Sequence, residues 1–366
     1  MLEILEHHRN QMETKPRIDV EFRPIFVNRY TAASLLQKAI RRSETAWALA
    51  AAHRLFDLDR RMLWRRLAVI LFEDVGIDDV DLALDILACM PRRSLPSLNW
   101  TAISNLVVRL SDAPKTQIAN HISILGHRDP KEVLEQCVFD LPFTEALEFC
   151  FSEKLSLPQK AAVCSALANF KGEGEFASHP EADRTRLISS LSEKTGSIAL
   201  PVILSEGIRT TNLPLPICAV ISLNGAHNEP QERHPSTEED DFPSSQIVCE
   251  LPSWAFDQYT RAGLAALRHF HNRCTEWRAW WSERQLSSTE AFEALKFAHF
   301  EFESGAMKRR IFREPDYKFH ERTRELPFAD EPESNSSTYS ILSGNWAQFE
   351  KVRASQIRAA FRSESV

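Results

Sequence analysis

The sequence is poor in glycine, with 10 glycines among 366 residues, against a usual share of about 7%. Nucleotide-binding α/β folds and tight-turned β-sandwiches need glycine at their turns, so this scarcity argues against both. No uninterrupted apolar run approaches the roughly 20 residues that a membrane-spanning helix requires. We therefore expect a mostly helical, soluble, cytoplasmic protein with no membrane partner.

The seven cysteines are dispersed, and no two of them form a Cys-x-x-Cys pair. A secreted disulfide framework has an even number of cysteines at regular spacings, so this odd set argues against one. Cys150 and Cys164 lie in apolar runs, where a free cysteine behaves as a small hydrophobic side chain. We expect buried thiols in a reducing compartment.

The motifs of common catalytic sites are also missing. The sequence has no phosphate-binding Gly-x-x-x-x-Gly-Lys-Ser/Thr loop, no HExxH, no GxSxG, no kinase signature and no zinc-deaminase spacing. His269 and His271 point to different sides of a helix, so they cannot share one metal ion there. We expect no cofactor, metal site or catalytic residue. An enzyme with a dispersed site around His269, His271, Glu276 and His299 is the remaining enzymatic alternative.

Negative charge is concentrated in one proline-containing segment. Residues 229–241 hold six carboxylates and one arginine, which is most of the formal net charge of −7. Few large apolar residues occur across 224–250, as is typical of a linker. A helical region is therefore expected on each side of it.

Most of the remaining sequence repeats apolar residues at helical spacing. Trp64 belongs to such a stripe over 60–73, and we expect it in the core. Segment 198–223 is apolar and proline-containing, and we expect a buried helix followed by an extended piece. The other expected helices cover 32–53, 79–90, 98–110, 115–124, 130–139, 143–151, 158–169, 182–194, 253–274, 275–284, 288–312 and 345–362.

Successive helices with short loops predict an all-α fold. We expect an irregular antiparallel helical array, with a second, smaller helical region after the acidic linker. No fixed repeat period argues for a solenoid. The predicted parts are an N-terminal leader (1–31), a helical domain (32–223), the linker (224–250), a C-terminal helical domain (251–328), a flexible tether (329–344) and a terminal amphipathic helix (345–366).

A charged stretch follows the start of the first helical domain. Lys38, Arg41 and Arg42 fall within one helical turn, so we expect a cationic face opposite the apolar stripe. Ser43 is a candidate cap of the next helix, and Gly76 suits the left-handed position that ends a helix. Surface ion pairs, each contributing about 0–1 kcal/mol, are the ordinary interpretation of such charges.

Segment 32–83 also resembles a known family. Its motifs are Lys-x-Ile-Arg-x-Ser at 38–43, Arg-Arg-Leu at 65–67 and Glu-Asp-Val-Gly at 73–76. They resemble, in order and spacing, the helical region after the ATPase module of the replication-associated recombination protein A family. Those proteins are bacterial clamp-loader-like AAA+ ATPases related to the Werner helicase interacting protein. Arg42 and Glu44 stand where that family usually has glycine and aspartate.

In that family the region belongs to a C-terminal helical part associated with oligomerisation. The resemblance therefore implies a helical scaffold that self-associates or shares a protein partner. The 31 residues before Ala32 are too few for the family's ATPase module, so the resemblance implies no ATP hydrolysis by this chain. A separate AAA+ ATPase is the partner that it suggests.

Clustered cations and aromatic residues are the candidate contact residues. Cations combined with stacking faces are typical of proteins that bind single strands. The candidates for nucleic-acid or partner contact are Lys38, Arg41, Arg42, Arg65, Arg66, Lys308, Arg309, Arg310 and Arg313. The candidates for partner docking, with core packing as the alternative, are Trp277, Trp280, Trp281, Trp346 and Phe349.

Together these patterns predict a non-catalytic helical accessory protein of DNA replication, repair or mobile-element maintenance. It would act through oligomerisation or through binding a partner, DNA included. A helical protein–protein interaction scaffold without a nucleic-acid role is the alternative. Salt-dependent binding to DNA separates the two hypotheses.

Overall fold

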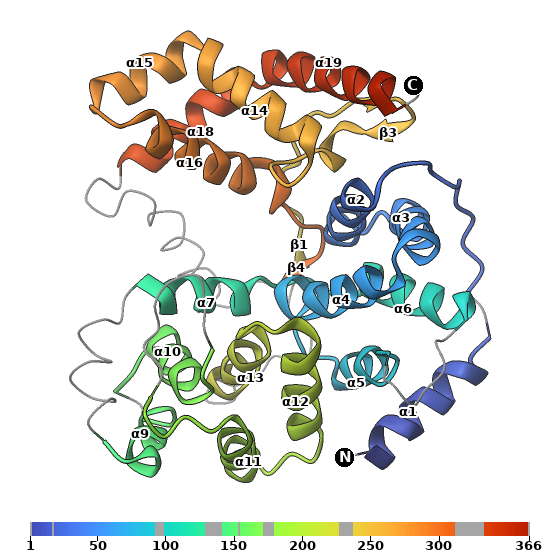
Figure 1. Ribbon diagram of the computed structural model, residues 1–366, viewed down its shortest axis with the longest axis vertical. Coiled ribbons are helices and arrows are strands. Elements are labelled where there is room, and N and C mark those ends of the chain that lie inside the picture. The colour runs from blue at the N-terminus through green and yellow to red at the C-terminus, as the bar shows by residue number, and fades with distance from the viewer. Residues whose placement is uncertain are drawn as a thin grey trace. The chain divides into compact units, whose positions relative to one another are not determined.

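Figure 1 shows a computed structural model of the chain. It describes residues 2–16, 18–91, 99–128, 141–152, 154–170, 179–226, 237–311 and 333–364. These residues are mostly helical, with only four strands of two residues each, so the predicted all-α fold is confirmed. None of the helices in these ranges is long and apolar enough to cross a bilayer.

Two compact units divide the chain, and each combines segments that are distant in the sequence. Unit 1 comprises Met1–Asp19, Arg61–Glu238 and Arg310–Thr323, and unit 2 comprises Val20–Arg60, Glu239–Arg309 and Arg324–Val366. The domains predicted from the sequence are consecutive, whereas Val20–Arg60 groups with the C-terminal segments. Hydrophobic periodicity could not reveal this, because it shows that a helix buries one face but not against which partner.

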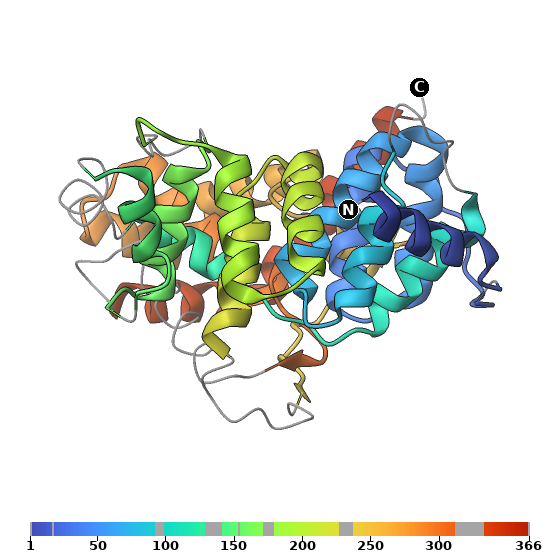
Figure 2. The same ribbon diagram turned by 90° about the horizontal axis from the view of Figure 1, so that it is seen from below.

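Unit 1 is an array of helices packed in pairs, with α12 beside α13 and α1 on α5 (Figures 1 and 2). Trp64 is buried in its core, as predicted. β1 and β4 pair antiparallel, with Thr237 opposite Ile311. The elements are α1 (Leu2–Thr14), α4 (Arg60–Ile70), the π-helical turn η1 (Leu71–Val75), α5 (Val80–Ala88), α6 (Trp100–Asp112), α7 (Ile118–Arg128), α9 (Phe143–Phe149), α10 (Leu157–Leu167), α11 (Arg184–Thr195), α12 (Ala199–Thr211), α13 (Leu215–Ala226), β1 (Thr237–Glu238) and β4 (Arg310–Ile311).

The N-terminal part of the predicted leader is a helix of unit 1. His8 Nδ1 lies 2.7 Å from Asp85 Oδ1, and Lys15 Nζ donates to Asp85 Oδ2 at 3.1 Å. These contacts hold α1 against α5, together with the buried side chains of Leu5 and Met12. Residues 2–14 therefore belong to the folded core of unit 1.

The extended piece predicted within 198–223 is wrong, because this segment forms the two helices α12 and α13. Pro201 and Pro216 lie in their first turns, where a missing backbone N–H leaves no helical hydrogen bond unmade. Proline density therefore misled the sequence interpretation here. The helix predicted over 130–139 lies outside the described residues.

Unit 2 packs an N-terminal helix pair with the C-terminal helices. α14 and α19 are antiparallel neighbours, since Phe270 contacts Phe349 at one end and Phe256 contacts Phe361 at the other. The elements are α2 (Arg29–Arg41), α3 (Thr45–Leu58), β2 (Ile247–Val248), β3 (Leu251–Pro252), the 3-10 turn η2 (Ser253–Ala255), α14 (Arg261–Arg273), α15 (Thr275–Glu283), α16 (Ser288–His299), the π-helical turn η3 (Phe300–Ser304), α18 (Glu333–Gly344) and α19 (Trp346–Glu364).

Several helix boundaries in unit 2 differ from those predicted. The helix expected from residue 253 begins only at Arg261, because the Thr260 hydroxyl accepts the Gly263 amide and caps it. The helix expected over 288–312 ends at Ser304, and the terminal helix predicted over 345–362 is confirmed. The predicted flexible tether 329–344 contains α18, whose Leu342 is fully buried.

The cap predicted for the second helix is also wrong. Ser43 has φ 53°, a left-handed conformation, and the N-cap position belongs to Glu44, whose side chain makes no capping hydrogen bond. The clear cap in this region precedes α2, where the Asn28 side chain accepts the amides of Tyr30 and Thr31. An amide oxygen at this position satisfies first-turn donors that have no helical partner.

The end of the predicted linker forms a β-hairpin. β2 and β3 pair antiparallel, and the two turn residues Cys249 and Glu250 have φ of 50° and 62°. Two left-handed residues are the signature of the type I′ turn, which matches the twist of two-residue hairpins. Cys249 is the exception to the predicted buried thiols: it is exposed, whereas the other described cysteines are buried. Cys137 lies outside the described residues.

Gly263 lets the first turn of α14 approach the preceding loop closely. A Cβ atom there would lie 2.1 Å from the Asp257 carbonyl oxygen and 2.5 Å from the Phe256 carbonyl carbon. We expect Gly263→Ala to lower the free energy of unfolding of unit 2 by about 1–3 kcal/mol, because backbone atoms cannot yield as a side chain can. Urea denaturation followed by tryptophan fluorescence measures this.

Gly344→Ala is the matched control. A Cβ at Gly344 meets nothing within 4 Å, so this substitution should leave stability nearly unchanged. Fluorescence reports mainly on unit 2, which contains six of the eight tryptophans, namely Trp47, Trp254, Trp277, Trp280, Trp281 and Trp346. Equal midpoints for the two variants would contradict the close approach at Gly263.

Candidate functional site

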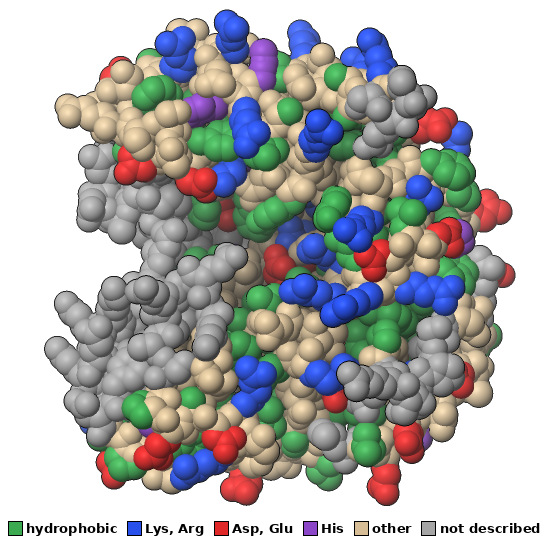
Figure 3. Space-filling view, viewed as in Figure 1, with side chains coloured by type: hydrophobic (Ala, Val, Ile, Leu, Met, Phe, Trp, Pro, Cys, Tyr) green, Lys and Arg blue, Asp and Glu red, His purple; other side chains and the backbone are tan. Residues whose placement is uncertain are grey.

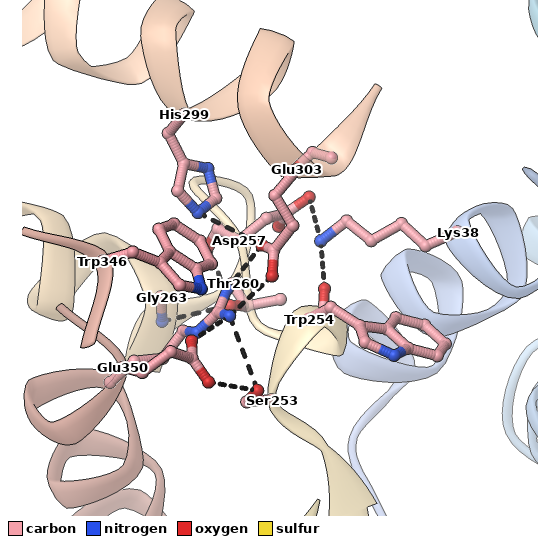
Figure 4. Close-up of polar contacts among 12 residues, drawn as sticks. Lys38, Ser253, Trp254, Asp257, Thr260, Gly263, His299, Glu303, Trp346 and Glu350 are labelled. Atoms are coloured by element: carbon pink, nitrogen blue, oxygen red, sulfur yellow. Dashed lines mark hydrogen bonds and ion pairs between the residues drawn. The ribbon is translucent and has the colours of Figure 1, made fainter. Parts of the chain in front are cut away.

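A buried network of ion pairs joins the helices of unit 2 (Figure 4). Arg353 of α19 donates two hydrogen bonds to Glu303 of η3, each of 2.6 Å, and neither side chain is exposed. Glu350 also pairs with Arg353 and accepts a hydrogen bond from the Ser253 hydroxyl at 2.6 Å. One guanidinium therefore links α19, η3 and η2.

Lys38 connects α2 to the same region. Its Nζ lies 2.9 Å from Asp257 Oδ2 and donates to the Trp254 carbonyl oxygen at 2.6 Å. Burial lowers the pKa of Lys38 to about 8, so the amine is still mostly protonated near neutral pH. The attraction of the Asp257 carboxylate offsets part of the desolvation cost of burying the charged Lys38 amine.

The two arginines after Lys38 are buried as well. Arg41 donates to the Ser304 carbonyl oxygen at 2.6 Å. The Arg42 guanidinium lies over the rings of Phe242 and Trp254, 4.5 and 4.9 Å from their centroids, and burial lowers its pKa. Arginine over aromatic faces makes cation–π contacts that gain strength when water is excluded. The predicted cationic face at residues 38–42 is therefore wrong, because these charges point into unit 2.

Charge states in the network follow from its burial and its ion pairs. Burial alone would raise the pKa of Glu303, but Arg353 and His299 hold it well below its usual range. Burial lowers the pKa of His299, whose Nε2 lies 3.3 Å from Glu303 Oε2. Arg353, Glu303 and Glu350 are paired with one another and withdrawn from solvent, so the network positions the helices that carry them.

The network predicts a loss of stability on mild acidification. His299 faces Glu303, Arg353, Trp346 and Phe349. Its folded-state pKa is below the unfolded value of about 6.5, so the unfolded chain gains the proton first as the pH falls, and stability decreases by up to about 1.4 kcal/mol per pH unit. Glu303 adds a second loss below about pH 4.5, since its folded pKa is depressed.

Urea denaturation at pH 7.5, 6.5 and 5.5 tests the contribution of His299. The His299→Gln variant should show a shallower decrease in the free energy of unfolding over this range than the unmodified protein. Parallel pH profiles for the two proteins would show that His299 does not control acid sensitivity.

The nine predicted contact cations do not form one surface. Lys38, Arg41, Arg42 and Arg310 are buried, Lys308 and Arg66 are half-buried, Arg65 and Arg309 are exposed, and Arg313 lies outside the described residues. Arg65, Arg66 and Arg310 belong to unit 1 and the other described ones to unit 2. Sequence clustering therefore does not identify a contact surface here.

The aromatic residues predicted to dock a partner pack in the core of unit 2. Trp277, Trp280, Trp346 and Phe349 are buried, and Trp277 stacks on Trp280 with ring centroids 4.8 Å apart. Trp281 is partly buried against the same core. These residues therefore pack in the core, which was the alternative interpretation. Helix α19 packs against other helices of its own chain.

The dispersed enzymatic site is not assembled. Trp277 donates to His271 Nδ1, so His271 carries its proton on Nε2, which lies 3.0 Å from the Ser288 hydroxyl. Glu276 accepts from the Asn345 side chain, and His299 faces Glu303 instead. Within the described part of the chain, no group of three or more His, Cys, Asp or Glu residues could hold a metal ion.

The structure reveals a basic surface that sequence reasoning missed. Lys351, Arg358 and Arg362 lie on one exposed stripe of α19, at positions i, i+7 and i+11. Arg261 and Arg268, seven residues apart, lie on an exposed stripe of the adjacent helix α14. We call these five residues the basic surface. Lys and Arg side chains line the upper margin of Figure 3, where Figure 1 draws these helices.

Among the described side chains, the helices of the basic surface carry no exposed acidic group. α14 contains no Asp or Glu, and Glu350, the only carboxylate among the described side chains of α19, is buried. None of the five cations forms an ion pair with another described residue. In a chain with a net charge of −7, this local excess of positive charge favours an anionic partner.

Neither models of protein families nor the curated proteins or solved structures that we searched show a match to this chain. The resemblance of segment 32–83 to the recombination protein family therefore depends on its motifs alone. In the structure this segment is divided, since Val20–Arg60 belongs to unit 2 and the following residues to unit 1.

Proposed function

We propose that this chain is a non-catalytic helical accessory protein of DNA replication, repair or mobile-element maintenance, and that it contacts nucleic acid through unit 2. The observation that supports this most is the basic surface, where exposed cations lie on two packed helices and form no ion pair with another described residue. Lysine and arginine contacts to phosphates supply most of the affinity of non-specific nucleic-acid binding.

The motifs of segment 32–83 support the same process and add self-association or a separate AAA+ ATPase as a partner. Lys38 and Arg41, the first cations of that segment, hold α2 inside unit 2. On this proposal Lys38 and Arg41 stabilise the helical scaffold, and nucleic acid binds to the exposed sides of α14 and α19.

Fluorescence anisotropy with labelled single-stranded and duplex DNA, repeated over a range of salt concentrations, tests the proposal. We expect binding that weakens steeply as salt rises, because phosphate contacts release condensed counterions. The scaffold alternative predicts no salt-dependent binding of either DNA form at micromolar protein. That result would exclude the nucleic-acid role.

A further inference from the structure

A hollow lies at one end of the basic surface, within unit 2. Its volume is about 240 Å³, and its lining includes Val27, Thr31, Phe256, Arg261, Gln356 and Phe361. Arg261 belongs to both the hollow and the basic surface, so the two are continuous. The volume is below the roughly 300–1,000 Å³ of a pocket for a drug-sized ligand, and it suits a single flat ring system.

Exposed aromatic side chains accompany the hollow. Phe26 is 80% exposed, Tyr30 56% and Tyr259 74%, and each lies within two residues of the lining. These are three of the four large aromatic side chains that are exposed among the described residues. Single exposed apolar residues are ordinary, but here three exposed aromatic residues are near neighbours in sequence of residues that line one hollow. Arg54 and Arg29 lie over two of the rings, Phe26 and Tyr30, so these rings already pack with cations and keep exposed surface for stacking.

The charges decide which ligand suits this arrangement. Among the described residues of the lining, Arg261 is the only charged one and none is a carboxylate. An apolar peptide would use the rings but would leave the basic surface without a partner. Single-stranded nucleic acid offers both a flat base for each ring and a phosphate for each cation, the combination found in single-strand binders.

We propose that the hollow and its aromatic rim bind bases of single-stranded nucleic acid, whose phosphates lie on the basic surface. This inference rests on the proposed function and narrows it to unpaired strands. Duplex DNA keeps its bases stacked inside, so it would use the basic surface without the rings.

Anisotropy titrations with a single strand, a duplex of the same sequence and an abasic strand of the same length test the inference. The variant Phe26→Ala/Tyr259→Ala should bind the single strand about tenfold or more weakly, with duplex binding unchanged. The unmodified protein should bind the abasic strand as weakly as this variant binds the normal strand. Tyr339→Ala, an exposed aromatic residue on α18, is the matched control and should bind normally. Unchanged thermal unfolding verifies that the variants fold.

Two results would overturn the inference. If the double variant binds the single strand as tightly as the unmodified protein, the rings do not stack on bases. Equal affinity of the unmodified protein for abasic and normal strands would have the same meaning. In both cases salt-dependent duplex binding would leave the proposed function in place, whereas no binding to any of the three nucleic acids would refute both.

Discussion

Replacing Arg353 with methionine is expected to lower the free energy of unfolding of unit 2 by about 3–5 kcal/mol. The substitution leaves Glu303 fully buried and Glu350 nearly so, both without their guanidinium partner. A buried carboxylate that loses its counter-ion retains its desolvation cost and loses the attraction that offset it. Urea denaturation followed by tryptophan fluorescence gives the change directly.

Two further variants make this prediction specific. Arg358→Met, on the exposed side of the same helix, should change stability by less than about 0.5 kcal/mol. The double variant Glu303→Leu/Arg353→Met should be more stable than Arg353→Met alone, because it removes the orphaned charge together with its partner. If the single and double variants are equally stable, or Arg353→Met matches Arg358→Met, the network does not hold unit 2 together.

Reversing the charge of the α19 stripe is expected to abolish most nucleic-acid binding. We expect Lys351→Glu/Arg358→Glu/Arg362→Glu to bind single-stranded DNA at least about 100-fold more weakly at low salt, because three attractive contacts become repulsive. The slope of log affinity against log salt should decrease by about 2, since about 0.7 counterions are released per single-strand phosphate contact. Anisotropy titrations at several salt concentrations measure both quantities.

A variant with the same change in net charge separates local contact from overall repulsion. Arg61→Glu/Lys154→Glu/Lys194→Glu reverses three exposed cations of unit 1. It should keep most of the affinity and nearly the full salt slope. If both triple variants lose binding equally, the basic surface has no special role and only the net charge of the chain matters.

The helical class of the protein could be predicted from the sequence because its signals are local. The low glycine content and the helical spacing of apolar residues can both be read within one segment, without knowing what it packs against. The burial of Trp64 and the position of the terminal helix were predicted correctly on that basis. The predictions failed where the answer depends on residues far away in the chain. Lys38 resembles a surface lysine until Trp254 and Asp257, more than 200 residues later, are known to face it.

The candidate surface was missed for a related physical reason. Lys351, Arg358 and Arg362 are visible in the sequence, but the sequence does not show whether a carboxylate from another element lies beside them. Only the packing of α14 against α19 shows that the adjacent helix adds Arg261 and Arg268 and no acid. A cluster of charges can therefore be identified as a contact surface only when its neighbours in space are known. Arg41 and Arg42 are equally prominent in the sequence, yet they are buried.

The central claim is that unit 2 binds nucleic acid through α14 and α19. Its most direct test is photochemical cross-linking to a single strand that carries photoreactive bases, followed by peptide mapping. The account predicts cross-linked peptides from residues 20–31, 256–273 and 346–362, in amounts that fall as salt rises. Cross-links confined to unit 1, for example around Arg65 and Arg66, would contradict it.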